Sequence, residues 1–149
     1  MPNKRSLTDF EELYIHVQRK VSAQWHKRLD PLVSGSQSLI LRILDVNGPQ
    51  KVSSIAERLG ITPGAVTSLS DKLIAGGYAI RNRDHTDRRV VQLEITDQGR
   101  ELLLKYQAEL GRTIEQFFVG LSEEDIHHLV RIYQQVLKNI DQRREENKE

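Results

Sequence analysis

The chain has 149 residues, of which 22 are basic and 21 acidic, so its formal net charge is +1. This length predicts one domain, or one small domain with helical extensions. The absence of cysteine excludes disulfides, thiolate metal sites and cysteine redox sensors. No apolar run approaches the roughly 18 residues of a membrane span, and no signal-peptide core follows the polar start. We therefore expect a cytoplasmic protein without a membrane partner.

Two helices are predicted before residue 50. The first carries apolar residues at steps of three and four, and the spacing of Thr8 and Glu11 predicts a capping box at its start. Pro31 should end this helix by about Leu29, because the residue before a proline avoids the helical region. The second helix is predicted at about 36–46. Its expected inward-facing residues are Leu39, Ile43 and Leu44.

A helix-turn-helix is predicted at residues 52–73. Ala56 is small where two helices must cross closely, Gly60 permits a tight turn, and Val66 locks the second helix onto the first. Thr62 and Pro63 suit the start of that second helix. Its exposed face would carry Gly64, Ala65, Thr67, Ser68, Asp71 and Lys72. Small side chains that form hydrogen bonds suit the floor of a DNA groove, although they could equally face solvent.

The apolar period changes from about 3.6 to 2 at residues 78–81 and 91–95, which predicts a β-hairpin. Residues 81–89 have a net charge of +2, from Arg81, Arg83, Arg88 and Arg89 against Asp84 and Asp87. An arginine on a narrow turn can enter the minor groove of DNA. We expect Asp87 to orient a guanidinium by accepting its hydrogen bonds. The alternative is a solvated loop.

Two further helices are predicted after Thr96, a plausible cap. The first ends at Gly120, and Ser122 with Asp125 forms a capping box for the second. Together with the first helix of the chain, these helices carry more apolar surface than a small winged unit can cover. A second copy related by two-fold symmetry would bury the stripes, so a homodimer is expected. The alternative is a monomeric antiparallel bundle of the same helices.

Four segments resemble the winged helix-turn-helix of the MarR family of bacterial and archaeal transcriptional regulators. They are residues 53–67, 71–73, 81–89 and 93–99. The most specific part is the Asp-x-x-Asp-Arg-Arg tip, followed at a fixed distance by apolar-x-apolar-Thr-x-x-Gly. The resemblance implies a mainly α fold with a small β-hairpin wing, in which long dimerisation helices flank the winged helix-turn-helix.

On this resemblance, residues 1–149 form a single MarR-type unit. The DNA-binding region is expected at 32–95, with the helix-turn-helix at 52–73 and the wing at 78–95. Dimerisation helices are expected at 1–30 and 96–143, and a solvated tail at 144–149.

The resemblance also assigns the DNA contacts. In the recognition helix they are Thr62, Pro63, Ala65, Thr67, Ser68 and Lys72. In the wing they are Arg81, Arg83, Asp87, Arg88 and Arg89, with Arg88 in the minor groove and braced by Asp87 and Arg89. Further candidates for phosphate contacts are Ser36, Gln37 and Ser53, because the start of a helix favours an anion.

We therefore expect a sequence-specific DNA-binding transcriptional regulator. It would be a homodimeric repressor of a nearby operon, bound to a pseudo-palindromic operator in double-stranded DNA and relieved by a small aromatic or lipophilic effector. Trp25, Tyr14 and Tyr106 could line the effector pocket, or they could simply belong to the core or an interface.

Two alternatives remain open at this stage. One is a winged-helix module that binds protein, because the fold alone does not specify nucleic acid. The other is a metal-responsive member of the same family, since Glu123, Glu124 and His127 have helical ligand spacing; a polar first turn is the ordinary interpretation of these residues. The sequence carries no phosphate loop and no nucleophile motif. It predicts no enzyme activity, no cofactor and no metal.

Overall fold

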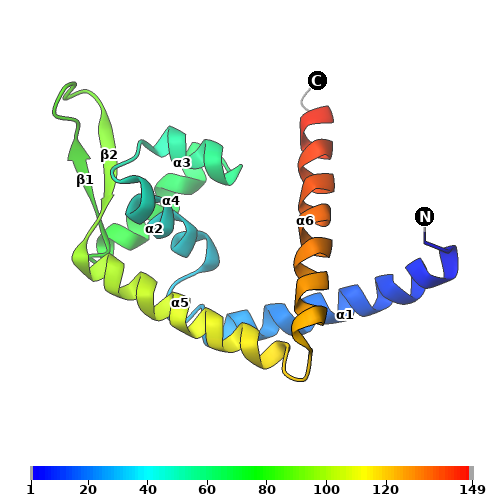
Figure 1. The fold of residues 1–149 in the computed structure, drawn as a ribbon. Helices are drawn as coiled ribbons and strands as arrows, with labels where there is room; N and C mark the ends of the chain where they lie inside the picture. Colours follow the sequence, from blue (N-terminus) through cyan, green and yellow to red (C-terminus); the bar gives the residue numbers. More distant parts are fainter. Residues whose placement is uncertain (1, 148–149) are drawn as a thin grey trace. The chain divides into compact units, whose positions relative to one another are not determined.

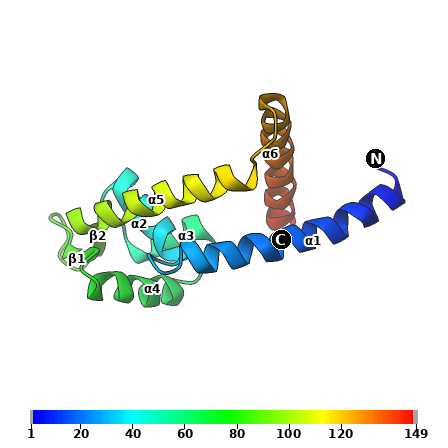
Figure 2. The same ribbon diagram turned by 90° about the horizontal axis from the view of Figure 1, so that it is seen from below.

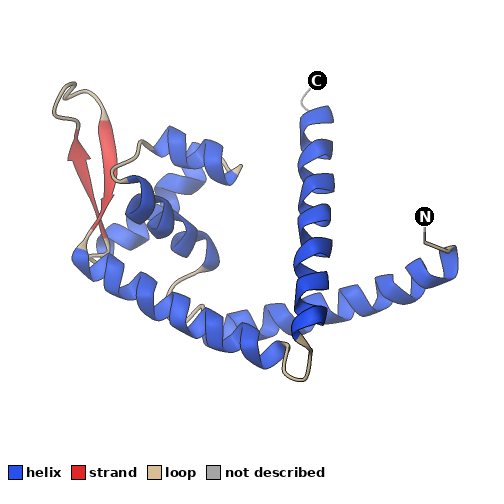
Figure 3. Cartoon of the chain, viewed as in Figure 1, coloured by secondary structure: helices blue, strands red, loops and turns tan. Residues whose placement is uncertain are grey.

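The computed structural model describes residues 2–147. Most of these residues are helical, with one two-stranded antiparallel sheet, which confirms the predicted fold class (Figure 1, Figure 3). In chain order the elements are α1 (Lys4–Arg28), α2 (Gly35–Asn47), α3 (Val52–Leu59), α4 (Pro63–Ala75), β1 (Ala79–Arg83), β2 (Val91–Ile95), α5 (Asp97–Phe117) and α6 (Glu123–Glu146). Within the described residues, no helix combines the length and hydropathy needed to cross a membrane.

The chain divides into two compact units, one ending at Thr113 and the other beginning at Ile114. The first unit contains a contiguous hydrophobic core to which α2, α3, α4, the hairpin and the start of α5 all contribute. Its buried members are Val33, Ile40, Leu41, Leu44, Ile55, Ala56, Val66, Leu73, Ala79, Leu93, Ile95, Leu102 and Leu103. This core fixes the helix-turn-helix and the base of the hairpin as one body.

The predicted helix-turn-helix is present, and its local signals act as expected. Ala56 and Val66 are buried between the helices. Gly60 ends α3 in the left-handed conformation with φ 66°, which favours glycine. The Thr62 hydroxyl accepts the Ala65 N–H at 3.1 Å and so caps α4, while Pro63 occupies the first turn.

The hairpin pairs β1 with β2 in a register that runs from Ala79 opposite Ile95 to Arg83 opposite Val91. The sequence did not predict a third participant. The Gln50 N–H donates to the Leu93 carbonyl at 3.0 Å, and the Leu93 N–H donates back at 2.8 Å. β2 therefore has backbone partners on both edges.

The Thr-x-x-Gly sequence joins the hairpin to α5. The Thr96 hydroxyl donates to the Gly77 carbonyl at 2.7 Å and accepts the Gly99 N–H at 3.0 Å, so Thr96 caps α5 as predicted. Gly99 is buried, and a Cβ added there would lie 2.1 Å from the Tyr78 carbonyl oxygen and 2.8 Å from Cγ1 of Ile95. Only glycine allows α5 to approach the start of β1 this closely.

Two local predictions in the first helices were wrong. Asn3, rather than Thr8, caps α1 by accepting the Arg5 N–H at 3.2 Å; Thr8 lies inside the helix, where its hydroxyl donates to the Lys4 carbonyl. Leu39 was expected to face inward but is 48% exposed. Helix α2 instead buries the adjacent Ile40 completely, and successive residues on a helix point about 100° apart.

The second unit contains α6, which begins at the predicted capping box. The Ser122 hydroxyl accepts the Asp125 N–H, and the Asp125 carboxylate accepts the Ser122 N–H, both at 3.1 Å. No residue of α6 is buried. The helix continues through residues 144–146 of the predicted tail, whereas 148–149 lie outside the described residues, as does Met1 of the predicted 1–30 segment. The predicted division into DNA-binding and dimerisation regions stays a prediction.

We expect Gly99→Ala to destabilise the protein by about 3 kcal/mol, because the new methyl group overlaps the Tyr78 carbonyl. Gly111 of the same helix provides a matched control, since a Cβ there meets nothing within 4 Å. Gly111→Ala should leave stability unchanged or raise it by about 0.5–1 kcal/mol. Thermal and urea unfolding measure both effects. Equal midpoints for the two variants would contradict the close approach.

Candidate nucleic-acid interface

The outward face of α4 matches the predicted recognition surface. It carries small polar side chains and one lysine, with Thr62, Pro63, Thr67, Ser68 and Lys72 exposed and Ala65 half-buried. The Thr67 hydroxyl donates to the Pro63 carbonyl at 3.0 Å, which orients its methyl group and its remaining lone pairs. This face can approach a groove closely and can form hydrogen bonds with bases or phosphates.

The four wing arginines have different partners. The Arg83 guanidinium donates to the Arg88 carbonyl at 2.9 Å, and Arg89 donates from Nε and Nη2 to the two Asp87 carboxylate oxygens at 3.1 and 3.2 Å. Arg81 forms an ion pair with Asp71 of α4. Arg88 is exposed, and within residues 2–147 no hydrogen bond or ion pair engages its guanidinium. Asp87 therefore orients Arg89 rather than Arg88, whose backbone is held by Arg83.

Two carboxylates shape the tip of the hairpin. Asp84 accepts hydrogen bonds at 3.0 Å from both the N–H and the hydroxyl of Thr86, and these bonds lower its pKa. The hydrogen bonds from Arg89 lower the pKa of Asp87. The positive charge of Lys51 lowers both pKa values further. Lys51 was not among the predicted site residues, because only the fold brings it near the tip.

The three predicted phosphate contacts differ in their surroundings. Ser36 and Ser53 are exposed at the first turns of α2 and α3. Gln37 is half-buried and forms a capping box with Ser34, with bonds of 3.1 and 3.2 Å. The Gln37 amide also donates to the Leu69 carbonyl at 3.5 Å, which ties α2 to α4. Gln37 therefore stabilises the packing of α2 against α4.

The predicted recognition helix and wing lie in the same unit. α4 packs on α3 and on β1, and the ribbon seen from below shows α4 beside the hairpin (Figure 2). The hydrogen-bonding face and the arginine-rich tip are thus presented by one body. Both elements are placed by the core rather than by loops, which suits the recognition of a rigid duplex.

The histidines do not form a metal site in the described part of the chain. No three His, Cys, Asp or Glu side chains gather there closely enough to hold an ion. The spacing of Glu123, Glu124 and His127 suggested a ligand set, but the nearest pairing joins Glu124 to His128, at 3.6 Å.

A pocket of about 340 Å³ lies in the first unit. Its lining residues are Ser22, Trp25, His26, Asp30, Gly35 and Tyr106. Two of the predicted aromatic residues, Trp25 and Tyr106, border it, whereas Tyr14 packs against Phe10 with ring centroids 5.9 Å apart. Nδ1 of His26 lies 2.6 Å from an Asp30 carboxylate oxygen and adds a polar wall.

Known proteins resemble this chain in sequence and in fold. Residues 33–91 match the model of the MarR family. The uncharacterized HTH-type transcriptional regulator YkoM of Bacillus subtilis is 36% identical over 91 residues, which cover 61% of this chain and 59% of that protein. The transcriptional repressor MdtR of the same organism is 33% identical over 94 residues, covering 63% and 61%. The chain thus spans about three fifths of the length of these two relatives.

The fold is also found among solved structures. The PcaV transcriptional regulator of Streptomyces coelicolor, crystallised with its natural ligand, superposes with a TM-score of 0.72 at 18% identity, covering 93% of this chain and 98% of that one. At this identity the likeness concerns the fold alone. The sequence matches identify residues 33–91 as a domain of the MarR family, and the relatives named above are transcriptional regulators.

Proposed function

We propose that the chain is a sequence-specific DNA-binding regulator of transcription that acts as a homodimer. The observation that carries the proposal is the free Arg88 guanidinium on a wing beside a recognition helix with a small polar face. That face suits the major groove, where Thr62, Pro63, Ala65, Thr67, Ser68 and Lys72 would contact bases and phosphates. Arg88 would enter the adjacent minor groove, which attracts arginine where it is narrow.

The remaining wing residues have supporting roles in this proposal. Arg83, Asp87 and Arg89 hold the tip in one conformation through the bonds described above. A preformed tip loses little conformational freedom on binding, so more of the attraction of Arg88 for DNA appears as affinity. Ser36 and Ser53 would add phosphate contacts at the starts of α2 and α3.

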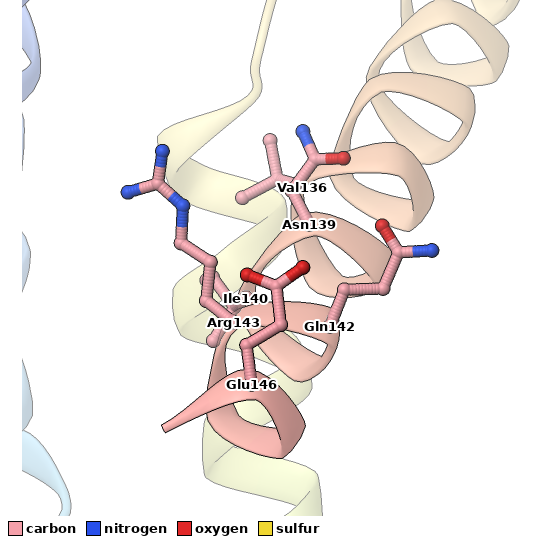
Figure 4. Close-up of a pocket in the computed structure, with 6 residues that line it drawn as sticks. All are labelled: Val136, Asn139, Ile140, Gln142, Arg143 and Glu146. Carbon is pink, nitrogen blue, oxygen red and sulfur yellow. The ribbon is translucent and has the colours of Figure 1, made fainter. Parts of the chain in front are cut away.

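The homodimer is proposed because two helices have long apolar stripes that stay exposed in the described part of the chain. No residue of α1 or α6 is buried, although Phe10 is 59% and Leu137 60% exposed. Figure 4 shows an open groove along α6 in which Val136 and Ile140 lie among polar side chains. Apolar surface of this extent favours association, and a second copy supplies equal stripes. Two copies related by a two-fold axis would bind a pseudo-palindromic operator.

The control of DNA binding is proposed to come from a small aromatic or lipophilic effector. The pocket lined by Trp25 and Tyr106 has the size and the aromatic walls that such a molecule needs. The likeness to PcaV, which was crystallised with its natural ligand, supports a ligand-responsive regulator, and the similarity to the repressor MdtR supports repression. We therefore propose a cytoplasmic repressor of a nearby operon that is released when the effector binds.

Arg88→Gln should weaken binding to promoter fragments next to the gene by about tenfold or more, because it removes a minor-groove contact. The slope of log affinity against log salt should also fall by about one. Gel-shift titrations at several salt concentrations measure both quantities. Arg112→Gln is the matched control, since the Arg112 guanidinium is held by Glu109 on α5. Unchanged binding by Arg88→Gln would favour a protein-interaction module.

Sedimentation equilibrium at micromolar concentration should give twice the chain mass of 17.2 kDa. Leu137→Glu should shift the protein toward the monomer, because it places a charge in the apolar stripe. Lys138→Glu changes the adjacent residue on the polar side of α6 and should leave the dimer intact. A wild-type mass of one chain would refute the homodimer without bearing on the recognition helix.

Trp25 is the only tryptophan of the chain, so its fluorescence should report on effector binding. Benzoate and related aromatic acids should change the emission in a saturable way and lower the affinity for DNA. Gly35→Val should weaken this binding, because its side chain extends toward the Tyr106 hydroxyl across the pocket. Gly111→Val, at an open position, is the control. A linear response in the wild type at millimolar concentrations would argue against this pocket.

A further inference from the structure

We propose that Asp71 and Arg81 form a pair that fixes the recognition helix against the wing, so that Arg81 is a positioning residue and not a DNA contact. The inference rests on the proposed function and deepens it. It changes the sequence-based assignment of Arg81, which grouped this residue with the other wing arginines. Of the four arginines in residues 81–89, only Arg88 would then contact DNA. Arg81, Arg83 and Arg89 would stabilise the conformation of the wing.

The strand register shows which side of the sheet Arg81 faces. Arg81 lies opposite Leu93, and residues that face each other across an antiparallel pair point to the same side of the sheet. Leu93 is buried in the core, so the Arg81 side chain leaves the sheet on the side of the core. α4 packs against β1, and the Arg81 guanidinium meets the Asp71 carboxylate there.

This ion pair is the polar link between the two elements that would bind DNA. Within residues 2–147, no other side-chain hydrogen bond joins α4 to a strand of the hairpin. The backbone adds two hydrogen bonds where the chain leaves the helix: the Gly77 N–H donates to the Ile74 carbonyl at 3.0 Å, and the Tyr78 N–H donates to the Leu73 carbonyl at 2.9 Å. The pair sits further along β1 and resists rotation of the wing about that junction.

The ion pair also changes the charge that the exposed side of α4 presents. Asp71 lies on the exposed side of α4 next to Lys72, and an isolated carboxylate there would repel DNA phosphates. Arg81 neutralises this charge locally. The Arg81 and Asp71 side chains are 40% and 58% exposed, so the pair stays at the surface without a large desolvation cost. Near the helix and the tip, the basic groups that form no ion pair with the described residues include Lys51, Lys72 and Arg88.

The test uses a charge-balanced double variant, Asp71→Asn with Arg81→Gln, and a charge swap, Asp71→Arg with Arg81→Asp. If Arg81 positions the wing, the double variant should bind the promoter fragment about fivefold more weakly with an unchanged salt slope, since an exposed ion pair contributes up to about that factor. The swap should restore affinity. Arg88→Gln, which removes a proposed DNA contact, should lower the slope by about one.

A measurement without DNA separates this inference from the proposed function. Amide hydrogen exchange of the free protein should be faster in residues 79–83 for Asp71→Asn, for Arg81→Gln and for the double variant alike, and slow again in the swap. If the wild type binds no DNA, the proposed function fails while this exchange pattern still supports a positioning pair. A salt slope lowered by about one in the double variant, or exchange unaffected by either single change, would overturn the inference.

Discussion

The close approach of Gly99 to the Tyr78 carbonyl is the constraint on which the placement of the hairpin relative to the core depends. It brings the start of α5 against the start of β1, and the Thr96 hydroxyl bonds both segments at once. The hairpin, which as an isolated two-stranded ribbon would be only marginally stable, is thereby held at its base by a helix whose Leu102 and Leu103 belong to the core. The direction of the wing follows from this junction.

The sequence predicted the features that depend on short-range chemistry. Gly60, Thr62 and Pro63 have one favourable role each within a few residues, and the structure uses them in those roles. The alternation of apolar residues in β2 likewise indicated the side of the strand on which Leu93 and Ile95 enter the core, whereas Val91, at the end of the strand near the tip, stays exposed. Such signals can be read from one chain because the partners are neighbours in sequence.

The sequence did not predict which polar groups would pair across the fold. Four arginines near two aspartates allow many pairings, and only the strand register shows that Arg81 meets Asp71 and that Arg83 holds the backbone of Arg88. The bridge between Gln50 and Leu93 was missed because it joins residues 43 positions apart with no distinctive motif. Leu39 was misplaced because one apolar pattern allowed two helix orientations, and tertiary packing chose between them.

The bridge between Gln50 and Leu93 makes the two ends of the wing differ in how they are held. β2 is held on one edge by β1 and on the other by Gln50, while the hydrogen bonds of residues 84–90 stay within the hairpin and include the one from Arg83 to the Arg88 carbonyl. The base of the hairpin is therefore held more firmly than its tip. A ligand that moves the tip would also move the paired base, which contacts the core. Changes in the length or sequence of the tip, in contrast, leave the packing of the core unchanged. Sequence changes at the tip should therefore disturb the stability of the core little.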